Sequence, residues 1–185
     1  MDENEKWILS FYRTSEITGA LFFGRLAKGM KPGPIQRDMT KHFSDESLHA
    51  WYWQKCLEDL NEKPIKMRES YQDQYLEAAG MPVNIMEVLA ITQIFEKRVI
   101  QQYAIHSQAP DLNPLIRNTF EKIMQDEKWH IEWVGKALKE LESEYGKELI
   151  EQTIKKFSKA DKEVYEKTLD EHEERLRKIL SIRKK

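Results

Sequence analysis

The stretch DESLH, residues 45–49, places a carboxylate, Glu46, three residues before an imidazole, His49. It recurs as DEKWH at residues 126–130, with Glu127 and His130 in the same places. Residues i and i+3 share one face of a helix. Each stretch therefore points one oxygen and one nitrogen ligand to the same side, and the spacing of the neighbouring apolar residues predicts that this side is buried.

The chain around these stretches predicts an all-α protein. Glycine and proline gather in a few breaks, and between them the apolar residues recur at helical rather than strand spacing. Asn84 with Glu87, and Asn113 with Pro114, are typical of helix starts. We expect four helices of roughly 25 to 30 residues joined by short turns. The exception is the segment from about residue 61 to 83, long enough to cross the length of a bundle and leave the second and third helices parallel.

Two further glutamates extend the pattern. Glu16 precedes Glu46 by 30 residues and Glu96 precedes Glu127 by 31. The chain thus contains two copies of a helix with one inward glutamate followed by a helix with inward Glu-x-x-His. Six side chains would meet in the middle of the bundle: Glu16, Glu46, His49, Glu96, Glu127 and His130.

Four buried carboxylates need compensating positive charge, because unpaired ions in a dry interior cost many kcal/mol. Two divalent cations would supply it. A site rich in carboxylates, with one imidazole per metal and no thiolate, suits iron or manganese. The other histidines, His42, His106 and His172, lack a glutamate three residues earlier and are expected to be ordinary core residues. Glu87, Glu121 and Glu132 lie off the inner stripe.

This order of ligands resembles the ferritin-like di-iron carboxylate superfamily, over about residues 5 to 145. The resemblance implies a four-helix bundle with a long crossover between its second and third helices. It also implies that the six residues hold two iron ions, manganese being possible at either, with two glutamates bridging and with Glu16, Glu46, Glu96 and Glu127 as the catalytic carboxylates.

The chain departs from two branches of that superfamily. Rubrerythrins carry a second glutamate three residues after the third-helix ligand, where this chain has Val99, and often a rubredoxin-like module, which a single cysteine, Cys56, excludes. Bacterioferritins carry a haem-binding methionine where this chain has Ser47.

The favoured function is a di-iron oxidoreductase that activates O₂ or peroxide and acts as an oxidase or oxygenase on a small organic substrate. Aromatic residues near the motifs could wall an apolar pocket, although plain core packing is as natural for them: Tyr12, Trp51, Trp53, Phe95, Trp129 and Trp133. Two alternatives stay open. One is iron oxidation and storage in an assembled shell, and the other is a helical interaction module with a structural metal.

Length and composition limit the remaining classes. With 185 residues we expect one bundle over residues 1–145 and a helical extension over 146–185, packed on the bundle or on a partner subunit. A net charge of −2 does not favour nucleic acid, and no apolar run is long enough for a membrane span. A cytoplasmic protein, possibly a homodimer, is the expectation.

Overall fold

A computed structural model describes residues 1–67, 71–168 and 170–182. Within these residues it is all helical, as predicted. The elements are α1 (Glu3–Gly29), α2 (Pro34–Asp59), α3 (Tyr71–Ala79), α4 (Ile85–Ser107), α5 (Pro114–Glu140), α6 (Glu142–Tyr145), α7 (Lys147–Thr168) and α8 (Asp170–Ile182). Leu169, one of the apolar positions of the expected C-terminal helix, lies outside the described residues.

Local sequence explains where the long helices begin. The side chain of Asp2 accepts hydrogen bonds from the backbone N–H groups of Asn4 and Glu5 and caps α1. Asn84 caps α4 by accepting from the N–H of Glu87, whose carboxylate accepts in turn from the N–H of Val83. Pro34 and Pro114 occupy the first positions of α2 and α5, where a missing N–H costs nothing.

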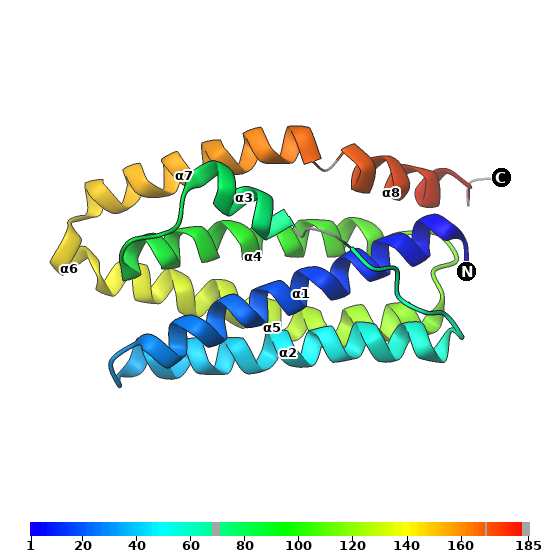
Figure 1. Cartoon of the computed structure of the whole chain (residues 1–185), viewed down its shortest axis with the longest axis horizontal. Coiled ribbons are helices and arrows are strands. Elements are labelled where there is room, and N and C mark those ends of the chain that lie inside the picture. The colour runs from blue at the N-terminus through cyan, green and yellow to red at the C-terminus, as the bar shows by residue number, and fades with distance from the viewer. Residues whose placement is uncertain (68–70, 169, 183–185) are drawn as a thin grey trace.

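Four long helices, α1, α2, α4 and α5, lie side by side (Figure 1). The chain runs one way along α1 and back along α2, and residues 60–67 and 71–84 recross the length of the molecule before α4 begins (Figure 1). As a result α2 and α4 run in the same direction, which matches the predicted crossover. The crossover contains one short helix, α3, which the sequence did not reveal.

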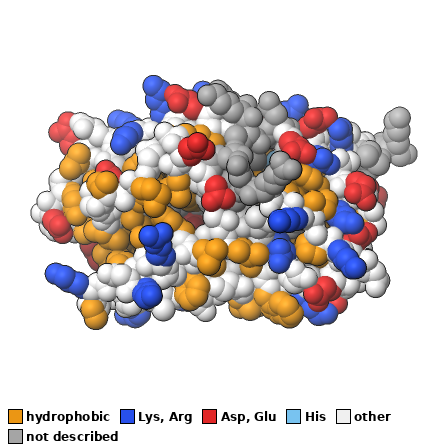
Figure 2. Space-filling model, in the orientation of Figure 1, with side chains coloured by type: hydrophobic (Ala, Val, Ile, Leu, Met, Phe, Trp, Pro, Cys, Tyr) orange, Lys and Arg blue, Asp and Glu red, His pale blue; other side chains and the backbone are white. Residues whose placement is uncertain are grey.

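The segment after Gly146 lies along the bundle. Gly146 has a φ of 82°, a left-handed conformation that favours glycine, and it separates α6 from α7. The hydroxyl of Tyr75 on α3 donates to the carbonyl of Phe157 on α7 at 2.9 Å. On α8, Arg175 donates to Asn4 Oδ1 at 3.2 Å and its guanidinium lies over the ring of Trp7. The surface of this face mixes positive, negative and apolar side chains (Figure 2).

Apolar side chains pack into two clusters, one toward each end of the bundle. The first contains Ile8, Trp53, Tyr103 and Phe120, and the second contains Phe23, Met39, Trp133 and Val134. The glutamate and histidine side chains of the predicted set come from the middle of the four long helices, between these clusters. Packing on both sides therefore shields them from bulk water.

Candidate metal centre

All six predicted residues are buried, at 5% exposure or less. Glu16 comes from α1, Glu46 and His49 from α2, Glu96 from α4, and Glu127 and His130 from α5. The structure brings them together in two interlocking groups, each with ligand atoms within 4.8 Å of one another. One group is Glu16, Glu46, His49 and Glu127, and the other is His42, Glu46, Glu96 and His130. Either group could hold a metal ion.

Each histidine of the two motifs bonds to the aspartate of the other motif. Nε2 of His49 lies 3.2 Å from Oδ2 of Asp126, and Nε2 of His130 lies 3.3 Å from Oδ2 of Asp45. A histidine that binds a metal usually donates its second N–H to a carboxylate or carbonyl, which fixes its tautomer. The aspartates occupy Nε2 of both rings, so Nδ1 is the atom through which each ring could bind an ion, in place of its contact with the inner carboxylates.

The Nδ1 atoms of His49 and His130 face the inner carboxylates. Nδ1 of His49 lies 3.2 Å from Oε1 of Glu127, and Nδ1 of His130 lies 3.4 Å from Oε2 of the same residue. The two oxygens of Glu127 thus face one imidazole each, as a bridging carboxylate would. Glu46 belongs to both groups. Glu46 and Glu127 therefore contact residues of both groups, whereas Glu16 belongs to the first group and Glu96 to the second.

His42 also belongs to this cluster, so its expected role as an ordinary core residue is wrong. Its ring stacks on the ring of His130, with centroids 3.7 Å apart, and its Nε2 lies 3.1 Å from Oε1 of Glu96. His42 was not among the predicted ligands because no glutamate lies three residues before it. His42 instead precedes Glu46 by four residues, a spacing that also shares one helix face and could have revealed it.

The protonation of His42 differs from that of the other two rings. Trp133 donates its indole N–H to Nδ1 of His42 at 3.2 Å, and indole is a donor only. Burial lowers the pKa of His42 more than Glu96 raises it, so the ring is neutral. A neutral ring that accepts at Nδ1 carries its proton on Nε2. The geometry therefore places an N–H, rather than a lone pair, beside Glu96.

Burial and mutual contact make several groups of the cluster hold their protons. Burial, together with Glu16, Glu96 and Glu127, raises the pKa of Glu46 well above its usual range. Burial would lower the pKa of His130, but the hydrogen bonds to Asp45, Glu127 and Glu96 outweigh it and raise that pKa to about 12. The pKa of His49 is raised in the same way by Asp126, Glu127 and Glu16. Protons thus supply the positive charge that a metal would bring.

Three buried atoms of the cluster have no hydrogen-bond partner, Nε2 of His42, Nδ1 of His49 and Oε1 of Glu127, and two of them favour a metal ion here. Nδ1 of His49 and Oε1 of Glu127 are buried without hydrogen-bond partners, although they lie only 3.2 Å apart. Buried polar atoms are rarely left unpaired. A cation between them would satisfy both, and four carboxylates with two imidazoles form a donor set typical of iron or manganese.

Neighbouring residues fix the positions of Glu16 and Glu46. The hydroxyl of Tyr103 donates to Oε1 of Glu16, and it accepts in turn from the indole N–H of Trp53 at 3.1 Å. Burial raises the pKa of Tyr103, so its hydroxyl keeps the proton that it donates. Glu46 lies against Gly19, where an added Cβ would be 2.4 Å from Oε2. Glycine at this position makes room for the carboxylate.

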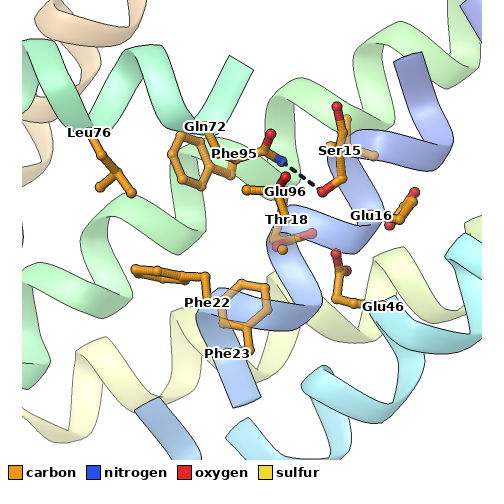
Figure 3. Close-up of a pocket in the computed structure, with 12 residues that line it drawn as sticks. Ser15, Glu16, Thr18, Phe22, Phe23, Glu46, Gln72, Leu76, Phe95 and Glu96 are labelled. Carbon is orange, nitrogen blue, oxygen red and sulfur yellow. Dashed lines mark hydrogen bonds between the residues drawn. The ribbon is translucent and has the colours of Figure 1, made fainter. Parts of the chain in front are cut away.

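A narrow pocket reaches these carboxylates between α1, α3 and α4. Figure 3 shows the rings of Phe22 and Phe23 on one side of it and the carboxylates of Glu16 and Glu46 on the other. The cavity volume is about 30 Å³. A water molecule needs roughly 10 to 15 Å³ by this measure, so the cavity holds about two.

Most of the aromatic residues predicted to wall such a pocket do not line it. Of the six, Phe95 lines it. Trp51 is 54% exposed, so the prediction was wrong for that residue. Trp53 and Trp133 are buried, and their indole N–H groups bond to Tyr103 and His42. They orient the side chains around the carboxylates.

No family model, curated protein or solved structure matches the chain. The evidence for its function is therefore the geometry of the site. Among the helices that the structure describes, none has the length and apolar character that a bilayer crossing requires.

Proposed function

We propose that the chain is a ferritin-like di-iron carboxylate oxidoreductase that reacts with O₂ or peroxide. The observation that carries the proposal is the pair of interlocking groups of buried glutamate and histidine atoms, each within 4.8 Å. The predicted order of ligands and the parallel course of α2 and α4 support it.

We assign Glu16 and His49 to one iron and Glu96 and His130 to the other, with Glu46 and Glu127 between them. Both imidazoles would bind through Nδ1, because Asp126 and Asp45 occupy their Nε2 atoms. His42 is left out of the ligand set because its Nε2 carries a proton. It faces Glu96 as a dipole that favours the charged carboxylate.

A pair of ferrous ions supplies two electrons to an oxidant. The protein's own part is to hold the site and keep bulk water away. Tyr103 fixes one oxygen of Glu16, and the aspartates fix the orientation of both imidazoles. The two apolar clusters on either side keep the carboxylates dry, which strengthens every charge interaction among them.

The pocket beside the carboxylates favours a small oxidant. Its volume of about 30 Å³ suits a molecule of two heavy atoms, such as O₂ or hydrogen peroxide. Its walls include Phe22, Phe23 and Leu76, and the cavity is too small for an organic ring. We therefore place the oxidant here and the organic reaction partner elsewhere.

The experiment is anaerobic titration with Fe(II), followed by addition of oxygen. Two irons per chain and an absorbance change on oxidation are expected. Glu121→Gln, an exposed carboxylate on α5, is the matched control and should bind two irons. A protein that binds no iron under these conditions, or whose bound iron is unchanged by both oxygen and peroxide, refutes the proposal.

A further inference from the structure

If the proposed function is correct, the oxidised metals must regain electrons from a donor that cannot touch them. The ligands are at most 5% exposed, and the adjoining cavity holds about two water molecules. An organic electron donor therefore needs a second site, linked to the ligands through the protein.

A second pocket lies where α8 meets α4 and the end of α7. It is lined by Gln102, Ile105, Tyr165, His172, Glu173, Leu176, Arg177 and Leu180. Its volume is about 210 Å³. Since an engineered apolar cavity of about 150 Å³ binds benzene, this pocket has room for an aromatic ring.

The lining favours an uncharged ligand. Arg177 donates to Glu173 at 2.8 Å, and the hydroxyl of Tyr165 donates to the same carboxylate at 2.6 Å. The charged side chains of the lining therefore satisfy each other. Ile105, Leu176 and Leu180 supply an apolar surface for a ring.

His172 offers this pocket an unused hydrogen-bond donor. The side chain is 1% exposed, and its Nδ1 has no hydrogen-bond partner. Its Nε2 lies 3.4 Å from the hydroxyl of Tyr12. Burial raises the pKa of Tyr12 and lowers that of His172 to about 4, so a protonated phenol faces a neutral imidazole. Tyr12 then donates to Nε2, and Nδ1 carries the N–H, which requires an acceptor oxygen.

Aromatic contacts connect His172 with the proposed metal ligands. The rings of His172 and Tyr12 have centroids 5.7 Å apart, and those of Tyr12 and Tyr103 have centroids 4.7 Å apart. The hydroxyl of Tyr103 donates to Glu16. Ring contacts and one hydrogen bond thus bridge the distance from the second pocket to an outer ligand.

We propose that the pocket between α4 and α8 binds an uncharged aromatic electron donor of the hydroquinone class, whose oxygen accepts the N–H of His172. The hydroquinone loses two electrons and two protons and becomes the quinone. Its two electrons would pass through the protein to the oxidised metal pair that the six glutamate and histidine ligands would hold, one electron per ion, and both protons would leave to solvent through the open side of the pocket. Both redox forms of the ligand keep an acceptor oxygen for His172.

Binding is tested first, on the full chain treated with a chelator, so that the result does not depend on iron. The probe is 4-fluorophenol, followed by ¹⁹F NMR, with fluorobenzene and 4-fluorobenzoate as comparisons. We expect 4-fluorophenol to bind about fivefold more tightly than fluorobenzene, because only the phenol has an oxygen for His172. The negatively charged 4-fluorobenzoate should bind more weakly than the phenol. Ile105→Trp, at a half-exposed wall position, should block binding, and Leu149→Trp, an exposed position on α7, should not.

Electron transfer is tested on the iron-loaded, oxidised protein under argon, by the loss of its ferric absorbance. Hydroquinone should reduce Ile105→Trp and His172→Phe several-fold more slowly than the unaltered protein and Leu149→Trp. Dithionite, a small inorganic reductant, should reduce all four at similar rates. Unchanged 4-fluorophenol affinity in both pocket variants, or unchanged hydroquinone rates, overturns the inference. A protein that binds 4-fluorophenol but no iron refutes the proposed function and the donor role, and leaves the binding site supported.

Discussion

Helices α1 and α2 present Glu16, Glu46 and His49, and helices α4 and α5 present Glu96, Glu127 and His130 in the same order. The surroundings of the two halves differ. A tyrosine hydroxyl holds Glu16, whereas Glu96 faces the imidazoles of His42 and His130. The third residue after the first glutamate is Gly19 in one half and Val99 in the other.

A repeated ligand pattern therefore need not give two equal metal positions. Burial and charge set the affinity of each position, and the neighbours that control them are not repeated. We therefore expect two irons that differ in affinity.

Glu127→Gln should have the largest effect, because it removes the carboxylate whose two oxygens face both imidazoles. Both halves lose a ligand and a negative charge, and we expect iron content to fall from two per chain to nearly none. Metal analysis of the purified variant checks this, with Glu121→Gln as the control. Retention of two irons would show that Glu127 does not bridge.

Removal of the metal should lower the Tm of the protein more at pH 8 than at pH 6. The folded pKa of His130 is raised to about 12 from 6.5, so its proton stabilises the metal-free fold fully below pH 6.5, and this stabilisation declines as pH rises toward 12. Iron must displace such protons, so its affinity rises with pH, by about tenfold per pH unit for each proton. Calorimetry should show the Tm difference between loaded and chelator-treated protein widening from pH 6 to pH 8. A difference that narrows contradicts the assignment.

Each motif histidine bonds to the aspartate of the other motif, so the iron affinity of each half can be lowered separately. Asp126→Asn should weaken the iron at His49, and Asp45→Asn the iron at His130, by roughly 10- to 100-fold. The Asp45 variant should have the larger effect because the side chain of Asp45 is 15% exposed and that of Asp126 is 35%. Competition with a chromophoric chelator measures both affinities. If each substitution weakens both irons equally, the two positions are not independent.

Gly19→Ala tests the difference at the third residue after the first glutamate. The new methyl group would lie 2.4 Å from Oε2 of Glu46, so the bridging carboxylate must shift. Overpacking typically costs about 1 to 3 kcal/mol, and we expect iron affinity to fall about tenfold or more. Val99→Ala, at the equivalent place in the other half, adds no atom and should keep nearly full affinity. Equal affinities in the two variants would contradict the role given to Gly19.

Much of the cluster could be predicted because its pattern is local. Helix periodicity places Glu46 with His49 and Glu127 with His130 on shared faces, and the matching intervals of 30 and 31 residues relate the halves. What the sequence did not reveal depends on contacts between helices. The exchange of Asp45 and Asp126 and the bond from Tyr103 to Glu16 join residues far apart in the chain. No spacing rule within one helix can reveal them.

His42→Phe should have the smallest effect on metal content, and it separates a neighbour from a ligand. A phenyl ring keeps the stacking with Phe23 and His130. It removes the acceptor of the Trp133 N–H, so we expect the free energy of unfolding to fall by about 1 to 3 kcal/mol. Two irons per chain should still bind, because Nε2 of His42 carries a proton in the neutral ring.

Substitution of a true ligand provides the matched control. His130→Phe removes the proposed ligand atom Nδ1 and should reduce the content to one iron per chain, as should His49→Phe in the other half. Cobalt(II) absorption gives a second readout, because loss of a ligand changes the intensity of its visible bands. If His42→Phe also binds a single ion, His42 is a ligand, the second position has two imidazoles, and the difference between the halves lies in the ligands themselves.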